Sequence, residues 1–531
     1  MSITAVDVVA REAMVTSDNP LASQVGREIL RSGGNAVDAA IGTALALCVV
    51  KPSSSGIAGY GGCMVIYLSD GKRVVAVDYN TRAPKAAAPD MYELAEGWES
   101  CAPGRFPAVP GQKNFIGALA VSVPATIAGL ALAEEKFGRL GWGKVLEPAM
   151  KLAAEGFIVY PGLPENLKGF AQGTDDDSRA VFFPDGHIPV EGETWAQHDL
   201  AALLEILAAD PHALYRGEPA RRIVERVRSM EGILSEEDLA EYCAEVVEPL
   251  VFEYRGFRIH ASPGLTGSPT ALETLAILER LHPGPYVSGD PPYWGDLADA
   301  LTLAWRDRFA FLGDIADVQE KINQLVSGEH AESLAGLIRS GGIRTMPGGS
   351  VQSGDTVHVS TCDADRNMVA LTQTHGAGWG SRVGVPGLGI VLGHGMSRFD
   401  PRPGRPNSIS PGKAVLHNMS PLVITFDGEP TGAIGLPGGR MIPSAVAQFV
   451  VDLVDFGMTP GEALSHPRIH TEDGPIHATG DLPEAARNAI EERGHQLESV
   501  DAIAGLASGL IVGPARIVGA AQAGPEASLG V

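Results

Sequence analysis

The sequence predicts a layered α/β fold, and three observations support this prediction. Helical and extended patterns alternate through the first half of the chain, whereas the part after residue 356 consists of short strands and turns. An apolar helix follows these strands at residues 443–457. The chain has 531 residues, of which 44% are hydrophobic, so it can bury a large core, and its length alone allows more than one domain. Strands flanked by helices bury their apolar faces by stacking in layers.

The first half supplies most of the helices and two of the strands. Residues 21–50 are expected to form two helices separated by Ser32-Gly33-Gly34, which is a helix-stop signal. Residues 63–79 are expected to form two strands joined by a Ser-Asp-Gly-Lys turn. Four further helices are expected near residues 124–138, 142–156, 268–281 and 293–313.

The second half begins with a β-hairpin. Residues 357–362 and 367–374 alternate in the manner of strands, and the polar stretch 363–367 is expected to contain the turn. A connector rich in Gly, Ser and Pro, residues 341–355, precedes the hairpin and is typical of a mobile surface loop. Further strands are expected at residues 389–393, 421–426 and 431–436.

Composition and charge limit the possible partners. The net charge is −24, from 64 acidic and 40 basic residues, and such a surface repels nucleic acid and anionic membranes. The five cysteines are odd in number and lack CxxC spacing, so they indicate neither a disulfide framework nor a zinc knot and suit a reducing compartment. The N-terminus lacks the apolar stretch of a secretory signal, and no run reaches membrane-spanning length. A soluble, cytoplasmic protein is therefore expected.

Thr356 stands where the connector meets the hairpin, in the stretch Gly-Asp-Thr. A threonine inside a chain is a poor nucleophile, but a threonine at the start of a chain has its own amine as a base. Thr374 lies at the other end of the hairpin, and a turn near Asp365 brings the two threonines close to opposite each other. A threonine in a strand is by itself only a good β-former, so a catalytic role depends on the surrounding motifs.

Six motifs surround these threonines in order along the chain: NPLASQVGREILRSGGNAVDAAI, GIAGYGGCMVIY, DTVHVSTCDADRNMVALTQTH, LGIVLGHGMSRFD, NMSPLVITFDG and GLPGGRMIPSAVAQFVVD. Together they resemble the γ-glutamyltranspeptidase family, the glutathione hydrolases and related acylases, over nearly the whole chain. The resemblance implies an N-terminal nucleophile hydrolase with an αββα sandwich, made as a precursor that cuts itself before a threonine. It places the cut between Asp355 and Thr356, which gives a large subunit (1–355) and a small subunit (356–531) that stay together as one folded unit.

The resemblance also implies the roles of the catalytic residues. Before the cut, the Thr356 hydroxyl attacks the preceding carbonyl and converts the amide into an ester, which water then opens. Afterwards the free amine of Thr356, with an ordinary pKa of about 8, can accept the hydroxyl proton at neutral pH. Thr374 matches the family threonine that hydrogen-bonds the nucleophile. Gly438 and Gly439 match the family's glycine turn, whose backbone N–H groups bind the oxyanion.

The segments that recognise the substrate depart from the family pattern. Asn80 stands in the place of the arginine that grips the α-carboxylate of a γ-glutamyl group, and Arg82 lies two residues further on, on the same side of an extended segment. His417 and Asn418 replace a pair of serines. The segment that usually reads Ser-Ser-Gly-Gly is here Leu265-Thr266-Gly267-Ser268-Pro269.

Arg398 is the most telling departure, because it replaces the acidic residue that holds the α-amine. A cationic amine is repelled by an arginine, whereas a carboxylate is attracted and can be held by two hydrogen bonds. The simpler interpretation is that Arg398 turns outward or pairs with Asp400. With Arg398 facing the site, the sequence predicts hydrolysis, through an acyl-enzyme and without a cofactor, of an amide of a small carboxylate-bearing acid of the oxamate, succinyl or glutaryl type.

Three other functions stay open. The first is glutathione hydrolysis and γ-glutamyl transfer despite the substitutions. The second is metal-assisted hydrolysis, if His358, His375, His394 and His417 ligate zinc, although their spacing matches no tight motif. The third is an uncleaved homologue that only binds a ligand, against which the retained threonines and glycines argue. The residues expected to line the substrate pocket are Arg398, Asn80, Arg82, His417, Asn418 and His394.

Overall fold

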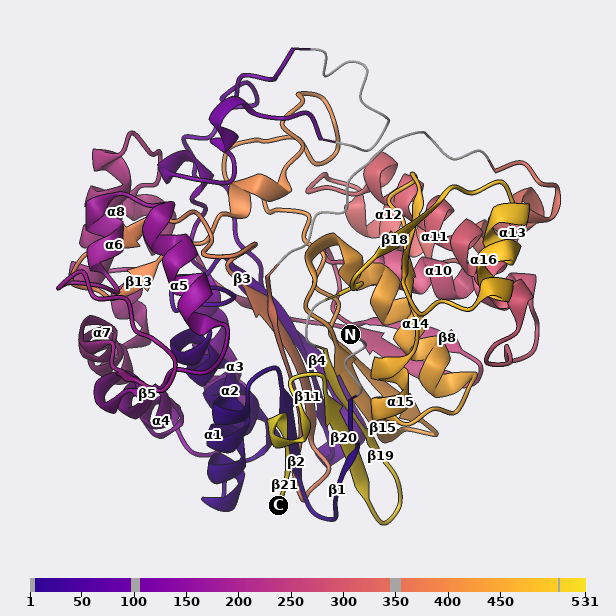
Figure 1. The fold of residues 1–531 in the computed structure, drawn as a ribbon, viewed down its shortest axis with the longest axis horizontal. Coiled ribbons are helices and arrows are strands. Elements are labelled where there is room, and N and C mark those ends of the chain that lie inside the picture. Colours follow the sequence, from indigo (N-terminus) through magenta and orange to yellow (C-terminus); the bar gives the residue numbers. More distant parts are fainter. Residues whose placement is uncertain (1–4, 97–105, 344–354, 505–506) are drawn as a thin grey trace.

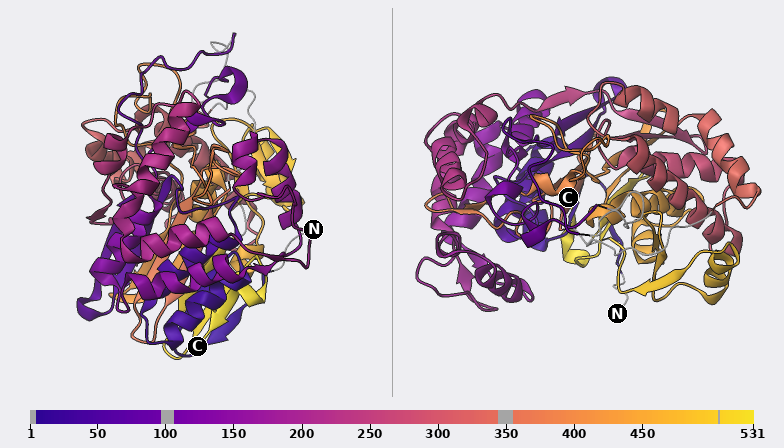
Figure 2. Two further views of the ribbon diagram at one scale, coloured as in Figure 1. Left: turned by 90° about the vertical axis from the view of Figure 1, so that its left-hand side faces the viewer. Right: turned by 90° about the horizontal axis from the view of Figure 1, so that it is seen from above.

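The computed structural model describes residues 5–96, 106–343, 355–504 and 507–531, and their secondary structure forms four layers (Figure 1). Two seven-stranded sheets face each other in the middle, and a group of helices covers the outer face of each sheet. Figure 2 shows the same arrangement from above, with the two helical groups at opposite ends of the molecule. The predicted αββα sandwich is therefore confirmed. Each sheet contains strands from both sides of Thr356, so the two parts of the chain share one fold.

All strand pairings within the two large sheets are antiparallel. The first sheet has the order β21 (Ser528–Gly530), β2 (Met14–Ser17), β10 (Val357–Cys362), β11 (Met368–Thr374), β3 (Gly61–Leu68), β4 (Arg73–Tyr79) and β7 (Glu245–Val247). The second sheet has the order β1 (Val8–Ala10), β20 (Ile517–Ala521), β19 (Ser508–Val512), β15 (Glu429–Gly435), β14 (Leu422–Phe426), β9 (Phe257–Ala261) and β8 (Leu250–Tyr254).

The helices divide into two groups. The group beside the first sheet consists of α1 (Pro20–Arg31), α2 (Ala36–Val50), α3 (Thr126–Phe137), α4 (Trp142–Glu155), α5 (Leu163–Gln172), α6 (Asp176–Ala180), α7 (His198–Ala209), α8 (Glu218–Ser229) and α9 (Glu236–Ala240). The group beside the second sheet consists of α10 (Ser268–Leu281), α11 (Pro291–Phe311), α12 (Val318–Leu325), α13 (Gly328–Arg339), α14 (Ile442–Val454), α15 (Pro460–Ser465) and α16 (Glu484–Glu492).

The predicted helices and the strand pair at 63–79 are all present, with bounds close to those expected. The strand expected at 389–393 is reduced to the short β13 (Ile390–Val391), which pairs with β12 (Gly384–Val385). Smaller sheets also join β5 (Phe157–Ile158) to β6 (Thr194–Trp195), and β16 (Ile469–His470) to β17 (Ile476–Thr479) and β18 (Leu497–Val500).

Helix α2 shows how sequence and packing combine. Its side chains are apolar nearly all round, and every residue from Ala36 to Val50 is buried, because the first sheet packs on one side and α1 and α4 pack on others. A capping box closes its N-terminus: the Asn35 side chain accepts from the N–H of Asp38, and the Asp38 side chain accepts from the N–H of Asn35. The helix therefore fixes the loop that follows it, residues 51–55, which reaches the site described below.

The β10–β11 hairpin forms as predicted. Val357 pairs with Gln373, so Thr356 and Thr374 lie next to each other at the open end of the hairpin. The Asp363 side chain closes the turn by accepting from the backbone and side-chain N–H groups of Asn367. The connector 341–355 lies mostly outside the described residues. None of the helices in the described ranges is both long and apolar enough to cross a membrane.

Candidate active site

The candidate active site is built around a chain of hydrogen bonds at the start of β10. Thr356 is buried, and its hydroxyl donates to Thr374 Oγ1 at 3.3 Å. The Thr374 hydroxyl donates to the backbone carbonyl of Asp355 at 2.6 Å, and Thr374 Oγ1 accepts from the N–H of Gly376 at 2.7 Å. The Thr374 hydroxyl thus bonds both the side chain of Thr356 and the carbonyl that immediately precedes it. A donor at this carbonyl stabilises the negative charge that develops there when the peptide bond is attacked.

The loop after α2 holds Asp355 from the other side. Ser54 Oγ donates to Asp355 Oδ1 at 2.7 Å. The same loop is tied to the segment after Thr374, because the N–H of His375 donates to the Ser54 carbonyl at 3.1 Å and the N–H of Trp379 donates to the Ser53 carbonyl at 2.8 Å. The residue before Thr356 is therefore fixed through both its backbone and its side chain.

The Gly438-Gly439 turn follows β15, which faces β10, the strand that begins directly after Thr356. β15 packs against β10 and β11 across the two sheets and ends at Gly435. At Gly435 a Cβ atom would lie 2.3 Å from Cε1 of His358, so this glycine permits the close approach of the two strands. Gly438 and Gly439 both have positive φ angles, 141° and 60°, which explains glycine at both positions. The chain then enters α14.

Arg398 is buried and is linked to Thr374 through Gly376. Its guanidinium Nη2 donates to the carbonyl of Gly376, whose N–H bonds Thr374. Its Nε has no hydrogen-bond partner among the described residues. Asp400 is instead bound by Arg402, with 2.7 Å between Oδ2 and Nη2. The interpretation that Arg398 turns outward or pairs with Asp400 is therefore wrong.

Two further arginines, which sequence reasoning missed, lie close to Arg398. Arg308 of α11 is buried and donates to the carbonyl of Thr266 at 2.8 Å and to the carbonyl of His417 at 2.7 Å, and it also binds Asn418 Oδ1 at 2.9 Å. Burial lowers the pKa of Arg308 to about 9, and the nearby charges of Arg440 and Arg398 add to this effect. Of these two arginines, only Arg440 could have been suspected from the sequence, because it directly follows the Gly438-Gly439 turn.

Arg440 is paired with a carboxylate. Its Nη1 lies 2.9 Å from Glu472 Oε2, and its guanidinium lies over the ring of Phe106, 4.4 Å from the centroid. Burial raises the pKa of Glu472, but Arg440 and His470 outweigh burial and lower it to about 2. One carboxylate therefore faces two buried cations, Arg308 and Arg398, and one partly buried cation, Arg440. The electrostatic character of this region is cationic, although the protein as a whole carries −24.

The histidines of the site are uncharged at neutral pH. Burial lowers the pKa of His417 to about 3, and the charges of Arg308 and Arg398 lower it further. Burial also lowers the pKa of His394 to about 3, again with a contribution from Arg398, and His394 Nδ1 lies 3.0 Å from the Phe115 carbonyl. Such rings add polarity to the site without competing with the arginines for an anion.

These histidines do not assemble into a metal centre. His358 lies within the sheet, with Nδ1 2.9 Å from Thr372 Oγ1 and Nε2 2.9 Å from Ser360 Oγ, so both ring nitrogens are occupied. In the described part of the chain, none of the four histidines belongs to a group of three potential metal ligands. The zinc-assisted alternative therefore gains no support from the geometry.

The 78–84 segment contains two residues that were expected near the substrate, Asn80 and Arg82, and the structure gives them different burial. Asn80 is buried, and its Nδ2 donates to the carbonyl of Val415 at 2.8 Å, beside the 417–418 segment. Arg82 is exposed, and its charge acts on Asp78. The two side chains therefore do not share one environment: β4 ends at Tyr79, and beyond it the backbone of Arg82 forms an isolated bridge with Ala414.

Comparison with known proteins identifies the family. Residues 22–526 match the family model described as gamma-glutamyltranspeptidase. The chain belongs to the γ-glutamyltranspeptidase family. The predicted resemblance is thus confirmed, and the chain is an N-terminal nucleophile enzyme that acts on amide bonds.

Relatives within the γ-glutamyltranspeptidase family carry two kinds of name. The chain is 36% identical to the Acylase ACY 1 proenzyme of Pseudomonas sp. (strain SE83), over 93% of this chain and 88% of that protein. It is 32% identical to the glutathione hydrolase proenzyme of Escherichia coli (strain K12), over 95% and 89%. Among solved structures, the cephalosporin acylase of Bacillus halodurans superposes with a TM-score of 0.86 at 28% identity, over 99% of this chain and 97% of that chain.

Proposed function

We propose that this chain is a self-processing N-terminal threonine amidohydrolase whose substrate is an amide of a small acid with a free carboxylate. The observation that carries the proposal is the hydrogen-bond chain from Thr356 through Thr374 to the Asp355 carbonyl. Arg398 is joined to this chain through Gly376, which bonds Thr374 with its N–H and Arg398 with its carbonyl. The chain would be cut between residues 355 and 356, and the two pieces would stay together because each sheet contains strands of both.

Self-cleavage uses the groups already in contact. Thr356 Oγ1 attacks the carbonyl carbon of Asp355, and the Thr374 hydroxyl stabilises the oxyanion that forms. The C–N bond breaks, the nitrogen takes up the proton that the hydroxyl lost, and an ester links Asp355 to Thr356 Oγ1. Water then hydrolyses the ester, which leaves a new carboxylate on Asp355 and a free amine on Thr356.

The mature site repeats this chemistry on the substrate. The amine of Thr356 accepts the proton of its own hydroxyl, and Oγ1 attacks the substrate amide. The backbone N–H groups of Gly438 and Gly439 bind the oxyanion, the protonated amine of the substrate leaves, and water hydrolyses the acyl-enzyme. The ratio of hydrolysis to transfer can be measured by adding an acceptor amine, which competes with water for the acyl-enzyme.

Charge supports an acidic acyl group. Arg398 has a buried Nε without a hydrogen-bond partner in the described part of the chain, and Arg308 and Arg440 add positive charge nearby. A carboxylate bound by Arg398 forms charge-assisted hydrogen bonds, whereas the ammonium group of a γ-glutamyl substrate is repelled. The acylase names of the Pseudomonas and Bacillus relatives agree with this substrate class. The rest of the proposed pocket would be lined by Asn80, His394, His417 and Asn418. Arg82 is not included in this lining, because its side chain is exposed.

The proposal is tested in two steps. Intact mass of the purified chain should show two fragments that meet at Asp355–Thr356, and Thr356→Ala should stay whole. The cut enzyme should then hydrolyse glutaryl or succinyl anilides faster than γ-glutamyl anilide, and chelator should not abolish this activity. Arg398→Gln should raise KM for the acidic anilides, while Arg402→Gln, at a buried arginine already paired with Asp400, serves as the matched control. Preference for γ-glutamyl anilide would favour the glutathione hydrolase alternative, and an uncut wild-type chain would favour the ligand-binding one.

A further inference from the structure

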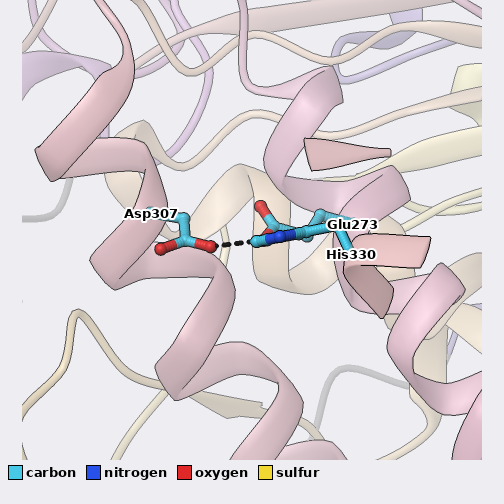
Figure 3. Close-up of side chains that lie close together, drawn as sticks. All are labelled: Glu273, Asp307 and His330. Carbon is cyan, nitrogen blue, oxygen red and sulfur yellow. Dashed lines mark hydrogen bonds and ion pairs between the residues drawn. The ribbon is translucent and has the colours of Figure 1, made fainter. Parts of the chain in front are cut away.

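A second cluster of chemically active side chains lies among the helices beside the second sheet. Glu273 of α10, Asp307 of α11 and His330 of α13 converge on one point (Figure 3). One atom from each, two carboxylate oxygens and a ring nitrogen, lie within 4.8 Å of one another. His330 Nε2 is 2.8 Å from Asp307 Oδ2 and 3.2 Å from Glu273 Oε1. None of the three residues belongs to the Thr356 site.

We propose that Glu273, Asp307 and His330 bind one divalent transition-metal ion, with Zn²⁺ as the leading candidate. Ligand atoms around a metal at about 2.1 Å are about 3.0–3.4 Å apart in octahedral or tetrahedral geometry. The two distances from His330 Nε2 are close to these separations. One imidazole and two carboxylates form a ligand set that suits zinc, and water completes the coordination.

The buried carboxylate of Glu273 provides the second observation that points to a bound cation. The Glu273 side chain is completely buried, and Oε2 has no hydrogen-bond partner among the described residues. A buried carboxylate oxygen without a compensating partner is costly. A dication at the cluster neutralises both carboxylates and occupies the open coordination of Glu273.

The cluster is also accessible to an ion from solvent. The side chains of Asp307 and His330 are 17% and 18% exposed, whereas Glu273 is closed off. An ion can therefore enter from the side of α11 and α13, and a water ligand can remain on that side. Without a metal, His330 Nε2 lies between the two carboxylates, 2.8 Å from Asp307 Oδ2 and 3.2 Å from Glu273 Oε1.

The position of α13 gives the site a structural purpose. It is the last helix described before Thr356, and Ser327 caps its N-terminus by accepting from the N–H of His330. After a cut before Thr356, α13 would be the last described helix of the large subunit. A metal bound by three helices would then hold α13 on α10 and α11.

The test uses the full-length chain, freed of metal by chelator and titrated with Co²⁺ and with Zn²⁺. We expect one Co²⁺ per chain with visible absorption of a nitrogen–oxygen site, displacement by Zn²⁺, and a higher unfolding temperature with Zn²⁺. His330→Gln and Asp307→Asn should each weaken binding at least about 10–100-fold, since loss of even an outer-shell partner has this effect.

His187→Gln is the matched control, because His187 Nε2 lies 2.9 Å from Glu193 Oε2 in an exposed pair with a single carboxylate. This variant should bind metal as the wild type does. Binding that survives in both His330→Gln and Asp307→Asn would place the metal elsewhere and overturn the proposal. Absence of the Co²⁺ absorption in folded wild-type protein would overturn it as well, and would identify the cluster as a protonated histidine between two carboxylates.

Discussion

Thr374 and Arg398 are bonded to the two ends of one residue. The N–H of Gly376 donates to Thr374 Oγ1, and the carbonyl of Gly376 accepts from the Arg398 guanidinium. The group proposed to orient the nucleophile and the group proposed to bind the substrate carboxylate are thereby held in a fixed relation. Three hydrogen bonds connect Thr356 to Arg398 through Thr374 and Gly376, so a substrate with its carboxylate at Arg398 and its amide at Thr356 would need only a short acyl chain. This relation favours small dicarboxylic acyl groups over long ones.

Thr374→Ala should slow self-cleavage by about 10²–10³-fold, because it removes the donor to the Asp355 carbonyl, and loss of one oxyanion donor has an effect of this size. The fraction of uncut chain is measured by intact mass during incubation after purification. Thr374→Ser keeps the hydroxyl and should recover most of the rate. Thr431→Ala, whose hydroxyl bonds the Ile424 carbonyl within the second sheet, is the control and should mature normally. Maturation of Thr374→Ala at the wild-type rate would contradict the assigned role.

Ser54→Ala should also slow self-cleavage, by about 10–100-fold. The serine hydroxyl fixes the Asp355 side chain, and a hydrogen bond to an acidic group is worth about 1.5–3 kcal/mol. The turnover of enzyme that has already matured should change much less, because Asp355 is no longer attached to Thr356. Maturation time courses and anilide kinetics separate the two effects.

The control for this prediction is Ser53→Ala, which leaves the bond between Ser54 and Asp355 in place. If Ser54→Ala affected turnover as strongly as maturation, Ser54 would act on the substrate rather than on the cleavage site.

The sequence predicted the elements that follow simple patterns. The hairpin register, the paired threonines and the helix stop at Ser32-Gly33-Gly34 all follow from local alternation and turn chemistry. The positions of Arg308 and Glu273 were not predictable in this way, since both lie in helices whose sequence gives no sign of which side chains converge. The exposure of Arg82 was missed because the extended pattern was assumed to continue past Tyr79. Long-range packing, which local patterns do not encode, decides each of these positions.

Gly435→Ala should destabilise the protein by about 1–3 kcal/mol, the usual cost of an overpacked core, and should lower activity. The added methyl group would lie 2.3 Å from Cε1 of the buried His358, so β15 and β10 would have to separate. This shift would move the Gly438-Gly439 turn away from Thr356. Unfolding temperature and anilide turnover are the measurements.

Gly480→Ala is the matched control, since no atom of the described residues lies within 4 Å of the added methyl group in this exposed position. It should leave both quantities unchanged. A Gly435→Ala variant with wild-type turnover would show that the glycine turn does not depend on this strand contact.

His358→Gln should make the protein less sensitive to acid, even if it lowers stability overall. Burial lowers the pKa of His358 to about 3, against an unfolded value of about 6.5. Between these values the unfolded chain binds a proton that the folded chain does not, so stability is lost as the pH falls below about 6.5. From about pH 7 to pH 5 this residue accounts for a loss of about 2 kcal/mol in the free energy of unfolding. Urea titrations at both pH values, on a Thr356→Ala background that keeps the chain whole, should show a difference smaller by this amount in His358→Gln. Removal of the exposed His198 by His198→Gln should not reduce the difference, and an equal reduction in both variants would mean that burial of His358 is not its cause.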